Sequence, residues 1–312
     1  MNKDSKIYVA GHNGMVGSSI FRLLKTEGYS NLIVRSSSEL NLKNQNDVQE
    51  FFVLEKPEYV FLAAAKVGGI LANNTYKAEF LYDNMMIQNN LIHHSYKNGV
   101  KKLLFLGSSC IYPKLAEQPL KEKYLLTASL EPTNEPYAIA KISGIKMCEF
   151  YREQYGCNFI SAMPTNLYGP NDNYNLETSH LVPALLRKFY EAKLNNSPSV
   201  EVWGDGTPFR EFLHVDDCAK ACLFLMNEYN EKQFLNVGSG VEHSIKQVSE
   251  IIKEKVGFDG VIEFNSTYPN GTPRKLMDVS KINNLGWSHQ ISFEKGIEMV
   301  LDILPEELQK HE

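Results

Sequence analysis

The sequence lacks both the long apolar segments of a membrane protein and the charge excess of a nucleic-acid-binding protein. None of its hydrophobic runs approaches the roughly 20 residues that a helix needs to span a bilayer. The formal net charge is -5, from 32 lysine and arginine residues and 37 aspartate and glutamate residues. Because there is no basic excess, we expect neither a nucleic acid nor an anionic membrane as a partner.

Cysteine is also scarce, and its spacing argues against disulfide and zinc sites. The chain has 5 cysteines and no Cys-x-x-Cys pair. The first residues lead directly into a strand-like segment without an apolar signal-peptide core. We therefore expect reduced thiols in a cytoplasmic protein. We expect no metal site either, because Asp216 and Asp217 have no companion ligands at suitable spacing and are better explained as a helix cap.

What the first half does contain is a regular alternation of strands and helices. Apolar runs that predict buried strands occupy residues 6–10, 31–34, 59–63, 103–106 and 159–163. Segments of helical periodicity separate them, at residues 15–27, 48–54, 75–97 and 137–155. Apolar strands that alternate with helices indicate an α/β fold, with a Rossmann-type doubly wound parallel sheet covered on both faces.

Beyond residue 168 the pattern changes to shorter elements with more Asn, Gly and Pro. A chain of 312 residues is long enough for one large domain or two closely packed ones. We predict a dinucleotide-binding domain over residues 1–168, with a return segment near 211–240. A smaller C-terminal α/β substrate-binding lobe would take up most of residues 169–312.

Three glycines, spaced three residues apart, join the first predicted strand to the first predicted helix. Such a turn lets the backbone approach a pyrophosphate closely at the N-terminus of the helix. The spacing alone is a weak signal, and a glycine-rich turn without a ligand is the alternative. We predict that this turn holds a dinucleotide through Gly11, Asn13, Gly14, Met15, Val16 and Gly17.

The residues after the second predicted strand bear on which dinucleotide is bound. An NAD site usually has an acidic residue there for the ribose hydroxyls, whereas a 2′-phosphate favours a cation. The stretch from Val34 to Ser38 contains Arg35 and three serines but no acidic residue. The next acidic residue is Glu39. We predict NADP (NADPH) as the cofactor, with Arg35 and serine hydroxyls such as Ser37 around the phosphate. The alternative is that Arg35 is an ordinary exposed loop residue.

Tyr137 and Lys141 lie four residues apart and therefore on one face of a predicted helix. A neighbouring ammonium favours the phenolate, which suits a tyrosine that works as an acid and base. About one such pair is expected by chance in this chain, so the pair gains weight only together with the glycine turn and Ser108. Cys110 follows Ser108 by two residues. It is either a buried inert thiol or, if the chain stays extended, a thiolate base facing the same site.

Together these features resemble the extended short-chain dehydrogenase/reductases, and among them the epimerase-reductases of GDP-4-keto-6-deoxy sugars. The resemblance covers nearly the whole chain. It rests on the segments AGHNGMVGS, LAAAKVGGILANNTYKAEF, LLFLGSSCIYPK, LEPTNEPYAIAKISGIK, MPTNLYGPNDN, VWGDGTPFREFLHVDD and NGTPRKLMDVSK. It implies NADPH-dependent 3,5-epimerisation and 4-reduction of GDP-4-keto-6-deoxy-D-mannose to GDP-L-fucose. The alternative is a C4 reductase, with or without epimerisation, of a related GDP-4-keto-6-deoxy sugar such as a heptose.

The resemblance also implies roles for individual residues. Ser108, Tyr137 and Lys141 would reduce the ketone, and Cys110 and His180 would carry out the epimerisation. Further cofactor contacts would come from Leu106, Ser108, Tyr137, Lys141, Pro164, Asn166, Leu167 and His180. The GDP-sugar would be held by Lys188, Trp203, Arg210 and Asn270.

Several of these residues have a simpler explanation from the sequence alone. Trp203 is either a core residue or a surface on which guanine stacks, and Arg210 either forms a surface ion pair or clamps the diphosphate. His214 is expected to be structural, bonding loop backbone. The resemblance further implies a homodimer, formed through helices near residues 80–97 and 142–155. The sequence offers Phe80, Met85, Ile87 and Leu91 as an apolar stripe for that interface.

Overall fold

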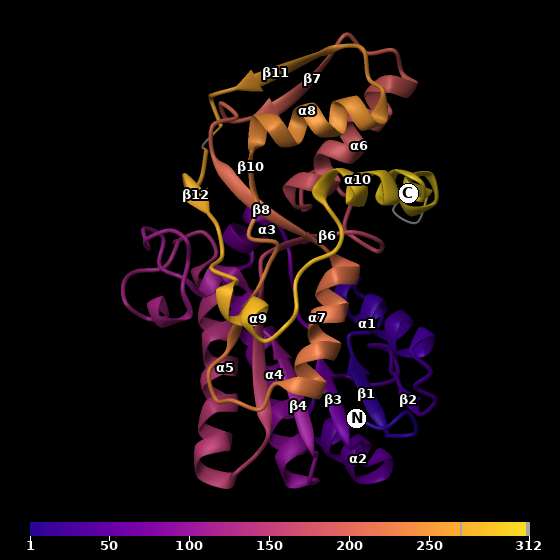
Figure 1. Cartoon of the computed structure of the whole chain (residues 1–312), viewed down its shortest axis with the longest axis vertical. Coiled ribbons are helices and arrows are strands. Elements are labelled where there is room, and N and C mark those ends of the chain that lie inside the picture. Colours follow the sequence, from indigo (N-terminus) through magenta and orange to yellow (C-terminus); the bar gives the residue numbers. More distant parts are fainter. Residues whose placement is uncertain (269, 310–312) are drawn as a thin grey trace.

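The computed structural model describes residues 1–268 and 270–309, and its main feature is a six-stranded parallel sheet (Figure 1). The strand order is β2-β1-β3-β4-β5-β9. The strands are β1 (Ile7–Ala10), β2 (Leu32–Ile33), β3 (Tyr59–Leu62), β4 (Lys102–Leu106), β5 (Phe159–Pro164) and β9 (Leu235–Val237). The central strands are fully buried because helices cover both faces. The predicted α/β fold is confirmed.

Two separate groups of helices cover the faces of this sheet. One face carries α1 (Met15–Thr26) and α7 (Val215–Glu228), which pack against each other. The other carries α2 (Gln45–Glu55), α4 (Lys77–Lys97) and α5 (Glu135–Tyr155). Each face has its own apolar cluster. Cys148 is buried in one cluster, Cys218 and Cys222 are buried in the other, and Cys157 is only partly buried.

The glycine-rich turn lies where the chain reverses its direction across the sheet. β2 pairs with one edge of β1 and β3 with the other, and ligands of open α/β sheets bind at such a switch point. Gly11 has a φ of +86°, and a Cβ added to it would lie 2.7 Å from the Cα of Ala64, just beyond β3. A Cβ on Gly17 would lie 2.1 Å from the Gly11 carbonyl oxygen. The tight turn therefore requires glycine at both positions.

A smaller lobe stands above the carboxyl edge of the sheet (Figure 1). Its own apolar core is built around α6 (Leu181–Leu194), α8 (Ile245–Val256), α10 (Phe293–Leu301) and α11 (Leu304–Gln309). β7 (Ser199–Trp203) pairs in parallel with β11 (Val261–Asn265) on this lobe. A second small sheet contains β6 (Asn166–Tyr168), β8 (Phe209–His214), β10 (Glu242–Ser244) and β12 (Arg274–Lys275). The remaining short elements are α3 (Ile70–Thr75), α9 (Ser280–Asn284) and the 3-10 turns η1 (Ser109–Ile111) and η2 (Glu122–Tyr124).

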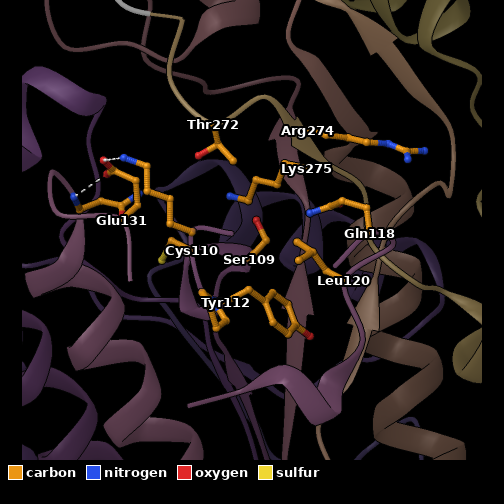
Figure 2. Close-up of a pocket in the computed structure, with 12 residues that line it drawn as sticks. Ser109, Cys110, Tyr112, Gln118, Leu120, Glu131, Thr272, Arg274 and Lys275 are labelled. Atoms are coloured by element: carbon orange, nitrogen blue, oxygen red, sulfur yellow. Dashed lines mark hydrogen bonds and ion pairs between the residues drawn. The ribbon is translucent and has the colours of Figure 1, made fainter. Parts of the chain in front are cut away.

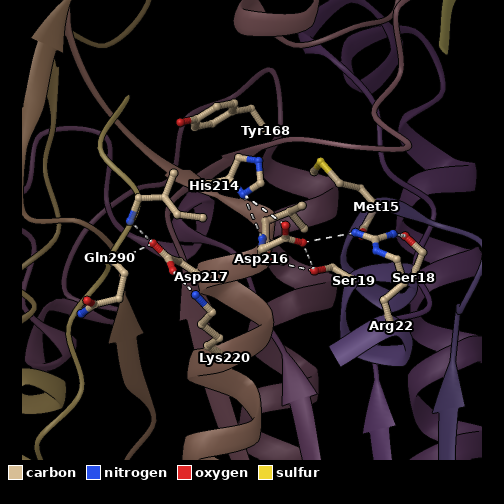
Figure 3. A network of polar contacts seen from close by, with 12 residues as sticks. Met15, Ser18, Ser19, Arg22, Tyr168, His214, Asp216, Asp217, Lys220 and Gln290 are labelled. Atoms are coloured by element: carbon tan, nitrogen blue, oxygen red, sulfur yellow. Dashed lines mark hydrogen bonds and ion pairs between the residues drawn. The ribbon is translucent and has the colours of Figure 1, made fainter. Parts of the chain in front are cut away.

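The start of α7 is bonded both to α1 and to the C-terminal segment at Gln290 and Ile291 (Figure 3). The cap of α7 is His214, whose Nδ1 accepts a hydrogen bond from the Asp216 amide at 3.3 Å, so its predicted structural role is confirmed. The two aspartates lie inside the first turn, and their prediction as the cap was wrong because the helix begins at Val215. The Asp216 carboxylate accepts a hydrogen bond from Ser19 of α1, at 2.6 Å. Asp217 is fully buried and accepts from the amides of Gln290 and Ile291, at 2.7 Å each.

The predicted apolar stripe on α4 was wrong, because two of its members belong to the protein interior. Phe80 and Leu91 are 2% and 0% exposed, respectively. The exposed aromatic side chains on α4 and α5 are instead Tyr82, Phe150 and Tyr155. Periodicity identified the helices but not which of their faces packs against the sheet.

The described part of the chain contains no helix with the length and apolarity needed to cross a membrane. α4 and α5 have 21 residues each, but polar side chains interrupt both of them. Among the same residues, no group of three His, Cys, Asp or Glu side chains is arranged to hold a metal ion.

Candidate active site

The residues predicted to reduce a ketone lie together where β4 ends and α5 begins. α5 starts at Glu135 with proline in its first turn, and Tyr137 and Lys141 follow one helical turn apart. The buried Lys141 ammonium donates a hydrogen bond to the Leu106 carbonyl, at 2.8 Å. It also lies 5.6 Å from the centre of the Tyr137 ring. Ser108 follows Leu106 by two residues, so the end of β4 carries both the carbonyl that binds Lys141 and the Ser108 hydroxyl.

Burial controls the charge of this pair. It lowers the pKa of Lys141 to about 8, an effect that the nearby Cys110 partly opposes. Burial also raises the pKa of Tyr137, with a smaller contribution from Cys110. The expected lowering of the Tyr137 pKa by Lys141 is therefore not observed, since the ammonium is directed to a carbonyl. Tyr137 stays protonated at neutral pH, which suits a group that donates a proton.

Cys110 lies in η1 rather than in an extended segment. The chain turns at Ser109, and the Ser108 hydroxyl accepts a hydrogen bond from the Cys110 amide at 3.4 Å. The condition that the chain stays extended at Cys110 is therefore not met. Cys110 nevertheless lines a cavity of about 60 Å³, together with Ser109, Glu131 and Lys275, although it is only 9% exposed (Figure 2). The thiol therefore borders this cavity instead of lying wholly within the core.

Sequence reasoning missed Lys275, which β12 brings into this cavity. β12 pairs with β8 in the register Lys275 to Arg210, across 65 residues of sequence. Burial raises the Cys110 pKa, and the Lys275 charge is the largest effect that opposes this rise. The NGTPRKLMDVSK segment contained the only signal of this residue. Its position depends on a strand pairing that local patterns do not reveal.

His180 is the cap residue at the N-terminus of α6. Its side chain makes no capping hydrogen bond and remains exposed. The Gly69 amide holds the preceding turn by donating to the Thr178 carbonyl at 2.8 Å. Desolvation by the surrounding protein lowers the pKa of His180, and the Lys275 charge lowers it further. Lys275 is thus electrostatically coupled to both residues predicted to carry out the epimerisation.

The candidate cofactor site fits a dinucleotide at the N-terminus of α1. Gly14 caps this helix without any side-chain hydrogen bond, and the first turn contains no acidic residue. The amides of the first turn are therefore available to an anion. Asn13 precedes the cap, and Met15 and Val16 begin the helix. At the same edge of the sheet, Pro164 ends β5 and Asn166 and Leu167 lie in β6.

Arg35 and Ser37 lie beyond β2, as predicted, but Arg35 is already engaged by protein groups. Its guanidinium forms an ion pair with Glu55 and donates to the Val34 carbonyl at 2.8 Å. Ser37 is exposed. The Glu39 carboxylate accepts hydrogen bonds from the Ser36 amide and hydroxyl, which lower its pKa. A 2′-phosphate at this place would compete with Glu55 for Arg35.

Trp203 is exposed on the smaller lobe, so the alternative that it is a core residue was wrong. It is 51% exposed and stacks on Tyr268, with ring centres 4.4 Å apart and an angle of 10° between the planes. The Lys188 ammonium lies 5.4 Å from the Trp203 ring centre and donates to the Glu201 carbonyl at 3.1 Å. An exposed flat aromatic surface beside a cation suits a purine with an attached phosphate.

Arg210 lies on β8 opposite Lys275, and Asn270 lies in the segment that leads into β12. Arg210 donates to the Phe209 carbonyl at 2.8 Å, and burial lowers its pKa. Within the described residues it forms no ion pair, so its charge is available to a diphosphate. The Asn270 side chain instead braces a loop, since its oxygen accepts a hydrogen bond from the Asp205 amide at 2.9 Å.

The comparison with known proteins agrees with this geometry. Residues 7–238 match the family described as NAD dependent epimerase/dehydratase. The chain belongs to this family. The resemblance inferred from the sequence is thereby confirmed, and the match includes the glycine turn, Ser108, Cys110, Tyr137 and Lys141.

Individual relatives cover almost the whole chain. It is 60% identical to a putative GDP-L-fucose synthase of Arabidopsis thaliana, over 95% of this chain and 90% of the relative. It is 54% identical to the GDP-L-fucose synthase of Escherichia coli K12, over 94% of each chain. Among solved structures, a GDP-mannoheptose C4 reductase from Campylobacter jejuni with NADP bound superposes with a TM-score of 0.91. That pair shares 43% identity over 98% of this chain and 99% of the other.

Proposed function

We propose that this protein is an NADPH-dependent enzyme that epimerises C3 and C5 of GDP-4-keto-6-deoxy-D-mannose and reduces C4, forming GDP-L-fucose. The observation that carries the proposal is the position of Cys110. This thiol lines the cavity next to the Ser108, Tyr137 and Lys141 set, with a lysine charge nearby. A reductase alone needs only the latter three residues. The relatives named GDP-L-fucose synthase support the same reaction.

The proposed epimerisation uses the acidity of the C–H bonds beside the C4 ketone. The Cys110 thiolate takes the proton from the carbon, and the electrons of the C–H bond move to the ketone oxygen to form an enolate. The hydroxyls of Ser108 and Tyr137 donate hydrogen bonds to this oxygen. His180 then returns a proton to the opposite face of the same carbon, which inverts the centre.

The proposed reduction uses the groups at the start of α5. Bound NADPH supplies the hydride for C4. Tyr137, which burial keeps protonated, gives its proton to the C4 oxygen. Lys141, fixed by the Leu106 carbonyl, would hold the nicotinamide ribose and offset the charge left on the phenolate. The turn from Gly11 to Gly17 would bind the pyrophosphate, and Arg35 would bind the 2′-phosphate after exchanging its partner Glu55.

The proposed GDP site spans the smaller lobe. Trp203 and Tyr268 offer a surface for guanine, and Lys188 and Arg210 offer charge for the diphosphate. For the assembly we propose a cytoplasmic homodimer through α4 and α5. The exposed Tyr82, Phe150 and Tyr155 support such an interface, because large exposed aromatic side chains favour a partner surface.

The function is tested by incubating the protein with GDP-4-keto-6-deoxy-D-mannose and NADPH. We expect loss of NADPH absorbance and a product whose NMR spectrum shows inversion at C3 and C5. The Tyr137→Phe protein is the control for background oxidation. Reduction without inversion would overturn the epimerase part of the proposal. It would favour a C4 reductase of a related GDP-4-keto sugar, which the likeness to the heptose reductase supports as the second candidate.

A further inference from the structure

Two lysines line the cavity that contains Cys110, and their surroundings differ. Lys114 is 44% exposed and its ammonium lies 3.9 Å from the Glu131 carboxylate. Lys275 is partly buried, and within the described residues its ammonium has no carboxylate at ion-pair distance and donates no hydrogen bond. In Figure 2 its side chain ends above Ser109, on the side where Cys110 lies. Its charge faces the cavity instead of a protein partner.

The acidic groups that influence Lys275 are already satisfied elsewhere. Glu211 of β8 is fully buried, and its two carboxylate oxygens accept hydrogen bonds from the amides of Gly240 and Met277, at 2.8 Å each. Glu131 accepts from the Thr133 amide at 2.9 Å and faces Lys114. Because Met277 lies two residues beyond Lys275, the bond to Glu211 also fixes the strand that carries the lysine.

Cys110 is influenced by groups from every element around it. Ser108 at the end of β4 caps its turn, and Tyr137 and Lys141 of α5 lie on one side. Lys141 donates to the Leu106 carbonyl and is the weaker of the two lysine effects on the thiol. Lys275 approaches from the smaller lobe and is the stronger one. A buried thiol needs such a cation to ionise near neutrality.

We propose that Lys275 is a positioning residue for the epimerisation, and that its ammonium is the positive charge in the shared cavity that favours the thiolate form of Cys110 over the thiol. The role rests on the proposed function, in which Cys110 is the carbon base. Because β12 belongs to the smaller lobe, the base is active only when this lobe is packed on the sheet. The reduction residues, which all lie at the end of β4 and in α5, do not depend on Lys275.

The proposal is tested on the thiol itself, without substrate. Full-length protein saturated with NADP⁺ is treated with iodoacetamide between pH 6 and about 10.5, a range that covers the ionisation of a thiol. Alkylation of the peptide that contains Cys110 is followed by mass spectrometry, which separates this thiol from the other four. The variants are Lys275→Met, Lys275→Arg and, as the matched lysine from the same cavity, Lys114→Met. Melting temperatures show which variants are folded.

We expect Lys275→Met to slow alkylation of Cys110 about tenfold at pH 7, because one nearby charge shifts a thiol by roughly one pKa unit. The rate should recover to the wild-type plateau at high pH, which a misfolded protein would not do. Lys275→Arg should keep most of the wild-type rate at neutral pH, and Lys114→Met should match the wild type. An unchanged pH profile in Lys275→Met, or an equal loss in Lys275→Arg, would overturn the proposal.

The test of Lys275 and the test of the proposed function can fail independently of each other. Suppose that Lys275→Met shifts the pH profile of Cys110 alkylation while Cys110→Ser still exchanges substrate protons. The electrostatic effect of Lys275 on the thiol then stands, and the role of Cys110 as the base fails. If Cys110→Ser loses exchange while Lys275→Met leaves the thiol profile unchanged, the base role stands and the role of Lys275 is overturned.

Discussion

The two chemical halves of the candidate site are built in different ways. The reducing half, with Ser108, Tyr137 and Lys141, comes from one strand end and one helix of the large domain. The epimerising half joins Cys110 of η1, His180 at the start of α6 and Lys275 of β12, which come from both lobes. The first half therefore lies entirely within the large domain. The second half exists only when the lobes are packed together.

The same difference explains how much of the site could be predicted from the sequence. The glycine turn and the Tyr137–Lys141 pair were found because their function depends on spacing within one turn or one helix. The sheet and its helices were found for the same reason, from local apolar periodicity. Their boundaries in the structure differ by only a few residues from the predicted ones.

Features that depend on long-range pairing could not be predicted in this way. Lys275 lines the cavity because β12 pairs with β8. Arg35 forms an ion pair with Glu55, which lies 20 residues further along the chain, on α2. The buried faces of α4 depend equally on its neighbours, so Phe80 was misassigned to an interface. The 3-10 turn at Cys110 follows from the Ser108 hydroxyl, which caps it.

Tyr137→Phe should produce the largest difference between the reducing half and the epimerising half. Removing the hydroxyl that gives its proton to the C4 oxygen should lower the rate of reduction by about a thousandfold. NADPH binding should change little, because the ring and Lys141 remain. Deuterium exchange at C3 and C5 should stay measurable, since Cys110 and His180 are intact. Appreciable turnover of NADPH by this variant would refute the role of Tyr137.

Asp217→Ala removes a contact between α7 on the large sheet and the C-terminal segment that leads into the smaller lobe. The buried carboxylate accepts from two amides of the segment that leads into α10, and removing it leaves both donors unpaired. We expect the free energy of unfolding to fall by about 2–4 kcal/mol in urea titrations. Asp216→Ala is the matched control, since this 35% exposed carboxylate should cost less than about 1.5 kcal/mol. Equal decreases in the free energy of unfolding in the two variants would contradict this structural role of Asp217.

Lys141→Met should lower kcat/KM for reduction by about 10- to 100-fold and weaken NADPH binding, because a charge-assisted hydrogen bond to the ribose is lost. Since burial lowers the pKa of Lys141 to about 8, the ammonium loses its proton as pH rises above 8. Wild-type reduction of an already epimerised substrate should therefore decline above about pH 8. The variant should show no decline in that range, and a matching decline would assign the titration to another group.

Arg35→Ala has the smallest expected effect and concerns only the choice of cofactor. Losing the cation near the predicted 2′-phosphate should reduce the ratio of kcat/KM for NADPH over NADH by about tenfold. Glu55→Gln is the informative partner variant, because it frees Arg35 from its ion pair and should move the ratio in the opposite direction. If neither variant moves the ratio, Arg35 is an ordinary loop residue.

The most direct test of the separation between the halves is deuterium exchange at C3 and C5 of the 4-keto sugar in D₂O, without NADPH. Wild type should exchange both positions. Cys110→Ser should exchange neither, because an alcohol of the same size is a far poorer carbon base, and it should still reduce an already epimerised substrate. Full exchange at both carbons by Cys110→Ser would contradict the account and return Cys110 to the inert buried thiols.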